Sequence, residues 1–412
     1  MKPTSRLWTC YGAMVCVAVA VNLPPVYLTT FSETFGGSGG LSTEQMGRIP
    51  AIVFAGLVLG IILSGPLADR WGGKLFAMLG VVLTGVGLVV MGLAQSYPSL
   101  LVSALLMGLG AGVLDMVLSP IVCALEPRRR APAMNWLHSF YSTGAVAAVL
   151  VGASGLDLSI PWRSIVLAAA AFPALVLVGF ARMKVPPLVE ENQRRDPAVK
   201  LAKSAFFLGV LAAMFLVGAT EAGMSQWLPA FAERALGLTK SAASFALAAF
   251  LVAMAAGRIC AAFLGDRARP IPLLVACAAA SIVFYLVGSF FSGRGVALAG
   301  CIAVGLSVSC LWPTLLALAA NRFPRGGASI FAALAAFGNA GCFLMPWVIG
   351  LVAATRGLHW GLGSAALAPA LLAVVLLWLA RPSRSHVGHP STKADYPGRL
   401  PDAETLPRRF SD

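Results

Sequence analysis

The chain has 412 residues, of which 58% are hydrophobic and only 11% are charged. Because a soluble globular chain carries roughly 25% charged residues, this composition excludes an ordinary soluble domain and indicates a membrane protein. The net charge of +14 would suit an anionic partner such as nucleic acid, but its distribution favours another explanation.

Apolar segments of about 20 residues recur along the chain, and a helix of about that length crosses a hydrocarbon core of about 30 Å. The first continues past Val21 without a signal-peptide cleavage pattern, so we interpret it as a helix. The fold class is therefore an all-α multi-pass membrane protein. We predict twelve transmembrane helices, at 7–30, 47–69, 74–94, 99–124, 134–156, 162–183, 203–230, 241–264, 271–291, 296–319, 327–354 and 360–380.

Two polar segments set the expected domain organisation. A segment at 184–202 separates an N-terminal six-helix half (1–183) from a C-terminal six-helix half (203–381). A tail at 382–412 is rich in Pro, Ser and Arg, a composition typical of disorder.

Basic residues concentrate at alternate connections between the predicted helices, for example at Arg70 and Arg128–Arg130. The opposite connections hold scattered ones such as Arg163 and Lys240. By the positive-inside rule, both termini and the central linker are cytoplasmic, and we expect the protein in the cytoplasmic (inner) membrane. Anionic lipid headgroups, rather than nucleic acid, are then the partner of the positive charge.

All eight cysteines lie inside predicted helices, with no C-x-x-C pair and no histidine at metal-ligand spacing. We expect them to be packing residues rather than metal ligands or redox thiols. The sequence also contains no nucleotide-binding loop and no nucleophile triad, so we expect no enzyme activity, no cofactor and no metal.

A charged turn between the second and third helices recurs half a chain later, which indicates an internal repeat. The turn reads Gly65-Pro-Leu-Ala-Asp69-Arg70-Trp-Gly72-Gly73-Lys74, and its weaker copy reads Leu264-Gly265-Asp266-Arg267. The shift from Asp69 to Asp266 is 197 residues, and it also pairs Gly60 with Gly257, Gly108-Leu109 with Gly305-Leu306 and Gly144 with Gly341. We therefore expect two parallel, pseudo-symmetric halves around a central cavity.

With this turn and repeat, the sequence resembles the major facilitator superfamily over nearly its whole length. The resemblance implies transport of a small solute by alternating access, with the charged turn latching the cytoplasmic side. A gating role follows for Gly65, Asp69, Arg70, Gly72, Asp266 and Arg267. The alternative is that Arg70 and Lys74 serve only to fix topology.

A narrower resemblance, to the fucose and glucose permease branch, rests on the fourth and fifth helices. The residues that carry it are Gly108-Leu-Gly110-Ala-Gly112-Val-Leu-Asp115 and Met134-Asn135-Trp-Leu-His138-Ser-Phe140-Tyr141, followed by Gly144-Ala145. It implies a proton-coupling role for Asp115 and substrate contacts at His138 and Tyr141.

An ionisable side chain inside the bilayer costs at least about 2.5 to 3.5 kcal/mol and so needs a partner or a task. Asp115 precedes Glu126 by eleven residues, which places it roughly 16 Å from the cytoplasmic end of its helix. A carboxylate there can carry a proton, or it can be a structural acid capped by a hydroxyl. The repeat pairs Asp115 with Trp312, which we expect on the opposite wall of the cavity as a substrate contact.

His138 forms a polar stripe with Asn135 and Ser142, three residues before and four after it. We expect this stripe to face the cavity, with His138, Tyr141 and Asn135 binding substrate. For His138, an interhelical hydrogen bond is the alternative.

Glu221 and Trp227 share the seventh predicted helix. A carboxylate near an indole suits a ring-shaped polar solute, so we expect Trp227 to bind substrate and Glu221 to be a second proton-coupling acid. The alternative is a packing role for Trp227 and a hydrogen bond within the bundle for Glu221. Asn339 in the eleventh helix is a further expected substrate contact.

Arg258 precedes Asp266 by eight residues, about 12 Å from the cytoplasmic surface. Its side chain can snorkel to that surface or pair with an acid. If it faces the cavity instead, it favours an anionic substrate, because a guanidinium binds carboxylate or phosphate bidentately.

These features together favour a monomeric transporter that moves a sugar or polyol with a proton. The closest alternative is an efflux antiporter for amphipathic drugs or an organic-anion porter on the same fold. A membrane receptor that moves no solute is a remote alternative, since the short tail has no effector domain.

Overall fold

The computed structural model describes residues 3–127, 130–185, 204–264, 269–323 and 327–381. These residues form α-helices joined by short loops and two 3₁₀ turns. The helices are α1 (Pro3–Asn22), α2 (Leu28–Phe35), α3 (Thr43–Trp71), α4 (Gly73–Leu93), α5 (Tyr97–Leu125), α6 (Arg130–Asp157), α7 (Trp162–Ala169), α8 (Ala171–Arg182), α10 (Ala205–Arg234), α11 (Lys240–Leu264), α12 (Pro270–Phe290), α13 (Arg294–Val308), α14 (Leu311–Arg322), α15 (Gly327–Arg356), α16 (Leu358–Ser364) and α17 (Leu367–Leu379).

Twelve helical segments in the described residues are long and apolar enough to cross a membrane. Four of them contain a break, so that α1 with α2, α7 with α8, α13 with α14, and α16 with α17 each make one span. The all-α, twelve-helix fold predicted from the apolar segments is therefore confirmed.

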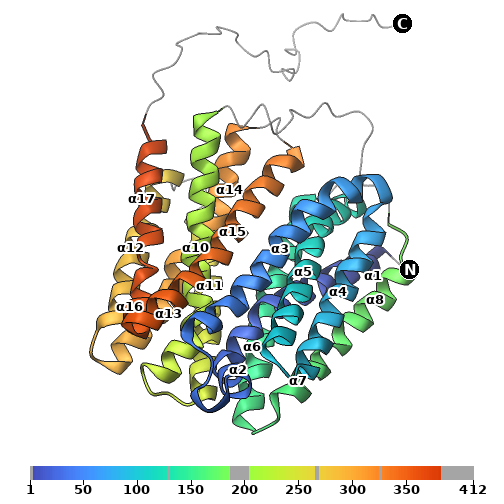
Figure 1. Cartoon of the computed structure of the whole chain (residues 1–412). Helices are drawn as coiled ribbons and strands as arrows, with labels where there is room; N and C mark the ends of the chain where they lie inside the picture. Colours follow the sequence, from blue (N-terminus) through green and yellow to red (C-terminus); the bar gives the residue numbers. More distant parts are fainter. Residues whose placement is uncertain (1–2, 128–129, 186–203, 265–268, 324–326, 382–412) are drawn as a thin grey trace, which may run out of the picture. The chain divides into compact units, whose positions relative to one another are not determined.

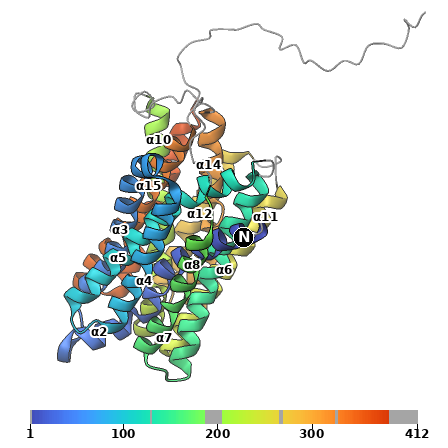
Figure 2. The same ribbon diagram turned by 90° about the vertical axis from the view of Figure 1, so that its right-hand side faces the viewer.

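We call the spans from α1 to α8 the N half and those from α10 to α17 the C half. All of them belong to one compact unit, Met1–Ala380. The predicted linker at 184–202 and tail at 382–412 fall almost wholly outside the described residues, so the division at the linker stays a prediction. Between the halves, α3 packs against α15 and α6 packs against α11. Figure 1 and Figure 2 show α3 and α15 side by side from two directions.

The internal repeat appears as the same close helix contacts in both halves. A Cβ added at Gly60 would lie 2.5 Å from the Leu109 carbonyl oxygen, and one at Gly257 would lie 2.9 Å from that of Leu306. These are the partners that the shift of 197 residues predicts. Only a glycine allows the two backbones to approach so closely, so the pairing inferred from sequence describes real helix crossings.

The second glycine pair behaves in the same way. Gly108 lies against the carbonyl of Val53, and Gly305 lies against the carbonyl of Phe250, with added Cβ atoms at 1.9 Å and 2.4 Å from those oxygens. Val53 and Phe250 are again 197 residues apart. The two halves are therefore built on one packing pattern.

Two local sequence signals set the ends of α3. At its start, the Ser42 hydroxyl accepts from the Gln45 N–H and the Gln45 side chain accepts from the Ser42 N–H, a capping box. At its end, Gly72 adopts φ of +92°, a conformation that side chains disfavour, and the chain turns directly into α4. We call the end of the bundle with Gly72 the cytoplasmic end, as its basic residues predict, and the opposite end the outer end.

The span formed by α13 and α14 is interrupted at Ser309 and Cys310. Pro313 lies in the first turn of α14 and has no N–H to donate to the carbonyl four residues earlier, that of Ser309. The break therefore leaves a backbone acceptor within the membrane region, and that acceptor needs another donor.

Candidate functional site

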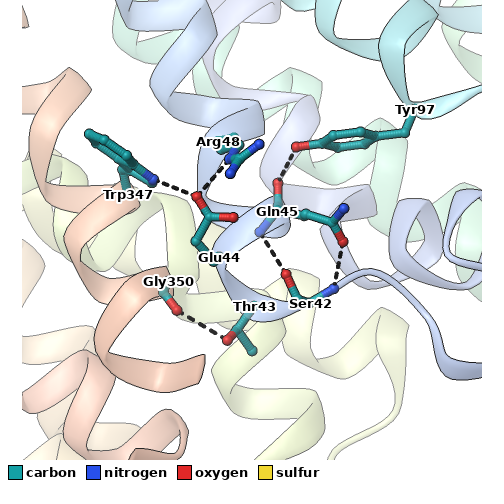
Figure 3. A network of polar contacts seen from close by, with 8 residues as sticks. All are labelled: Ser42, Thr43, Glu44, Gln45, Arg48, Tyr97, Trp347 and Gly350. Atoms are coloured by element: carbon teal, nitrogen blue, oxygen red, sulfur yellow. Dashed lines mark hydrogen bonds and ion pairs between the residues drawn. The ribbon is translucent and has the colours of Figure 1, made fainter. Parts of the chain in front are cut away.

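At the outer end, the two halves are joined by hydrogen bonds between α3 and α15. The indole N–H of Trp347 donates to Oε1 of Glu44 at 2.8 Å, and the same carboxylate oxygen accepts from Arg48 at 2.6 Å. The Thr43 hydroxyl donates to the Gly350 carbonyl at 3.1 Å. Figure 3 shows this network around the first turn of α3, with Tyr97 donating to the Gln45 carbonyl beside it.

Further contacts close the same end. The Thr29 hydroxyl donates to Glu233 at 2.5 Å, and Lys240 pairs with Glu33. Glycines again allow close approach, since a Cβ on Gly47 would lie 2.5 Å from the Pro346 carbonyl oxygen. In this conformation, the halves are thus fastened together at the outer end.

Arg258 on α11 lies where the halves meet nearer the middle of the bundle. Its Nη1 donates to the Ser142 hydroxyl on α6 at 3.2 Å, and its Nε donates to the Ser309 carbonyl at 3.2 Å. Nη2 lies 3.8 Å from the Met254 sulfur. Arg258 therefore does not snorkel to the cytoplasmic surface but reaches across to the other half.

The position of this guanidinium follows from the break in the α13–α14 span. The Ser309 carbonyl that Pro313 leaves without a helical donor is the one that accepts from Arg258 Nε. Gly257 brings α11 close enough, since its missing Cβ would lie 2.3 Å from the Ser309 hydroxyl oxygen. Proline, serine and glycine together hold the arginine at this place.

Other polar side chains lie within electrostatic range of Arg258. The charges of Arg258 and Glu221 act on each other and on the Tyr141 hydroxyl, and His138 also lies within electrostatic range of Arg258. The Tyr141 hydroxyl accepts from the buried Asn22 amide at 3.5 Å. We call Asn22, His138, Tyr141, Ser142, Glu221 and Arg258 the central cluster; its members come from α1, α6, α10 and α11.

The central cluster contains three residues that the sequence predicted for a site, His138, Tyr141 and Glu221. It does not include Asp115, which is partly buried on α5 and has no hydrogen bond to a described residue. The Asn135 side chain lies outside the described side chains. The roles assigned to these residues stay predictions.

The three other predicted substrate contacts lie in helix packing. Trp227 is fully buried, and its indole donates to the Pro346 carbonyl at 2.9 Å, which supports its packing alternative. The Asn339 amide donates to the Ala335 carbonyl of its own helix at 2.9 Å. The partly buried Trp312 ring packs against Gly338, where an added Cβ would lie 2.4 Å from it.

For the predicted cytoplasmic gate, the structure describes only part of the residues. Arg70 is exposed and Gly72 makes the turn, while Gly65 lies near Met116 of α5. The Asp69 side chain, and Asp266 with Arg267, lie outside what is described. Gating by this turn therefore remains a prediction.

Sequence reasoning missed two members of the site's surroundings. Asn22 was not predicted as a site residue, although an amide followed by Pro24-Pro25 in an apolar span is itself a polar signal. The side chain of Ser309 could not indicate its role, because the backbone carbonyl of Ser309 is the group that accepts from Arg258. The presence of Pro313 four residues later was the available clue.

The central cluster can bind a small anion. A guanidinium has five N–H groups, and Arg258 uses three of them in contacts with described residues. One N–H on each terminal nitrogen therefore has no described partner. Among the described side chains, no carboxylate lies within 4.0 Å of it to form an ion pair. The described residues also hold no group of three His, Cys, Asp or Glu side chains placed to bind a metal.

The chain is similar in sequence to known transporters. The chain is 26% identical over 347 residues to the 3-(3-hydroxy-phenyl)propionate transporter of Escherichia coli, covering 81% of this chain and 79% of that protein. It is 23% identical over 281 residues to a cis,cis-muconate transport protein of Acinetobacter baylyi, covering 64% and 67% of the two chains.

Among solved structures, the E. coli fucose:proton symporter superposes with a TM-score of 0.64 at 21% identity, over 93% of this chain and 100% of that one. At this identity, the likeness shows the fold alone. The sequence model of the Major Facilitator Superfamily matches residues 10–334 and 231–409. The chain therefore belongs to the Major Facilitator Superfamily and is a multi-pass secondary transporter of a small solute, not an enzyme.

Proposed function

We propose that this transporter moves a small organic anion, a carboxylate with an aromatic or unsaturated body, together with a proton. The observation that carries the proposal is Arg258. It lies between the halves. Among the described side chains, one N–H on each of its terminal nitrogens has no partner, and no acid lies within ion-pair distance. A carboxylate is the ligand that fits such a pair of donors.

The substrates named for two relatives support the same class. 3-(3-Hydroxyphenyl)propionate is an aromatic carboxylate, and cis,cis-muconate is an unsaturated dicarboxylate. The sequence favoured a sugar or polyol and kept an organic-anion porter as an alternative. The position of Arg258 and these relatives favour the alternative, while the fucose symporter supports only the shared fold.

The body of the substrate has suitable neighbours in the central cluster. Tyr141 offers an aromatic ring and a hydroxyl beside Arg258, and the exposed His138 can donate or accept a hydrogen bond. Two relatives with different carboxylate bodies suggest that recognition depends on the charged end. The carboxylate–Arg258 pair is therefore the main determinant of affinity in this proposal.

We assign the proton to Glu221. A substrate carboxylate at Arg258 places a second negative charge near that of Glu221, because both lie in range of the same guanidinium. Uptake of one proton with the substrate offsets this repulsion. Asp115, which is not part of the central cluster, is the other candidate acid.

The test is uptake and binding with purified protein in proteoliposomes. Wild-type protein is expected to bind 3-phenylpropionate and not its neutral amide, which has the same body without the charge. Removing one partner of a desolvated charge pair costs about 2–5 kcal/mol, so Arg258→Gln is expected to weaken binding at least about 30-fold. Arg258→Lys is expected to retain part of the affinity, because it keeps the charge but loses the bidentate geometry.

Arg322→Gln is the matched control, since Arg322 lies at the end of α14 over the Phe206 ring and outside the central cluster. It is expected to bind as wild type does. Equal binding of acid and amide, uptake of fucose or xylose in place of carboxylates, or unchanged affinity in Arg258→Gln would refute the proposal.

A further inference from the structure

Two cysteines far apart in sequence lie in contact inside the C half. Cys277 is on α12, and Cys310 is at the break between α13 and α14. Their sulfur atoms are 3.3 Å apart. Cys277 is partly buried and Cys310 is buried, and neither is in a disulfide.

Hydrogen bonds next to this cysteine pair fix the position of α12 relative to α13. One turn along α12 from Cys277, the Ser281 hydroxyl lies 2.8 Å from the Ser307 hydroxyl of α13. Ser281 also donates to the Cys277 carbonyl at 2.9 Å. Hydrogen bonds on neighbouring turns thus keep α12 and the break aligned, so the two thiols meet because of the helix packing and not by a chance rotamer.

We propose that Cys277 and Cys310 form an oxidisable dithiol that closes to a disulfide on reaction with hydrogen peroxide. A bonded sulfur pair is about 2.05 Å apart, so closure requires only a small further approach. One thiol attacks the peroxide and becomes a sulfenic acid as water leaves, and the second thiol displaces a second water to form the S–S bond. In total, two thiols lose two electrons and two protons, and the peroxide is reduced to two waters.

The disulfide would act on the neighbouring residue. Cys310 directly follows Ser309, whose carbonyl accepts from Arg258 Nε. Drawing Cys310 towards α12 moves that carbonyl relative to α11 and weakens the hold on the guanidinium. This effect on substrate affinity rests on the proposed function, whereas formation of the disulfide does not.

The first experiment needs no substrate. Purified full-length protein is treated with hydrogen peroxide, the remaining thiols are alkylated, and peptides are mapped by mass spectrometry without reduction. We expect a peptide pair linked through Cys277 and Cys310 that disappears after reduction. Cys277→Ser and Cys310→Ser are expected to abolish it, and Cys260→Ser, at an exposed cysteine of α11, is expected to leave it intact.

A second probe is phenylarsine oxide, which bridges two neighbouring thiols with loss of one water. It is expected to bind one per protein in a way that either Cys277→Ser or Cys310→Ser removes. If neither the linked peptide nor arsenical binding depends on these two residues, the dithiol proposal is overturned even if both serine variants fold and transport normally.

The third measurement addresses the link to Arg258. Peroxide treatment is expected to raise the apparent KM for 3-phenylpropionate about five-fold or more, the equivalent of losing one weak hydrogen bond, and reduction is expected to restore it. Cys277→Ser should be insensitive. A disulfide that forms without changing KM overturns the coupling to Arg258, while failure of carboxylate binding in untreated protein refutes the proposed function and leaves the disulfide result standing.

Discussion

The hydrogen bond between Trp347 and Glu44 is expected to stabilise the conformation in which the outer end is closed. It joins α15 to α3 at 2.8 Å, and its acceptor is a carboxylate whose side chain is 17% exposed. A hydrogen bond to a charged group contributes about 1.5–3 kcal/mol, and partial solvation reduces this to about 1–2 kcal/mol. Trp347→Phe removes the bond and keeps an aromatic ring near Phe343.

If the bond exists only when the outer end is closed, its loss shifts the ratio of closed to open protein by about 5- to 30-fold toward open. The shift can be measured by double electron–electron resonance between spin labels on a keto amino acid at Gly39 and Gly295. Both positions lie at the outer end, one in each half, with open space around them. The keto chemistry leaves the native cysteines in place.

Trp360→Phe is the matched control. Trp360 is an exposed tryptophan of the C half that contacts Phe290 of the same half. Its substitution is expected to leave the distance distribution unchanged. A Trp347→Phe distribution identical to that of wild type, with the protein folded, would show that this bond is not part of the closure energy.

Three further outcomes are expected. Gly47→Ala places a Cβ 2.5 Å from a carbonyl oxygen of the other half and should open the outer end. Gly56→Ala produces a similar clash, at 2.6 Å, inside the N half and should lower Tm without opening the outer end. The same spin-label distances and a melting curve distinguish the two variants. Glu221→Gln is expected to abolish acidification of the proteoliposome lumen during carboxylate uptake, measured with a pH-sensitive dye, while exchange of substrate across the membrane continues. Persistent acidification would show that another acid carries the proton. Tyr285→Phe removes the 2.7 Å bond to the Thr220 carbonyl and is expected to destabilise the C half by about 1 kcal/mol, measured as a lower Tm; an unchanged Tm would contradict this.

The fold was accessible from the sequence because its main signals are local or periodic. Apolar segments gave the spans, since segment length alone satisfies the bilayer. The glycine repeat gave the equivalence of the two halves but not the helix crossings themselves. The structure shows that Gly60 approaches Leu109 in one half, and the shift of 197 residues relates this contact to that of Gly257 with Leu306 in the other.

The site was only partly accessible, because its members meet through three-dimensional packing. His138 and Glu221 could be suspected because they are ionisable residues in apolar spans. Their proximity to Arg258 depends on how α6, α10 and α11 pack, which the sequence does not show. The contact between Cys277 and Cys310 could not be foreseen, since 33 residues and a helix break separate them. For these cysteines, the sequence favoured packing alone.

The sugar prediction rested on a family resemblance, and the fucose symporter supports only the shared fold. The motif around Asp115 resembles sugar symporters, yet Asp115 lies outside the central cluster. For Arg258, the sequence favoured snorkelling or pairing with an acid over substrate binding, and it could not show that the Ser309 carbonyl would accept from the guanidinium. The backbone carbonyl of Ser309, rather than its side chain, holds the Arg258 guanidinium in this position.

The link between Pro313 and Arg258 has a consequence for how such a transporter can change over generations. The proline creates the unpaired carbonyl of Ser309, and the arginine occupies it. Replacing Arg258 alone leaves the Ser309 carbonyl without its donor. Replacing Pro313 alone restores a backbone N–H at position 313, which competes with the guanidinium for that carbonyl. We expect related sequences to keep or exchange these two residues, 55 positions apart, together. Under the proposed function, a change from anionic to neutral cargo would then require both substitutions.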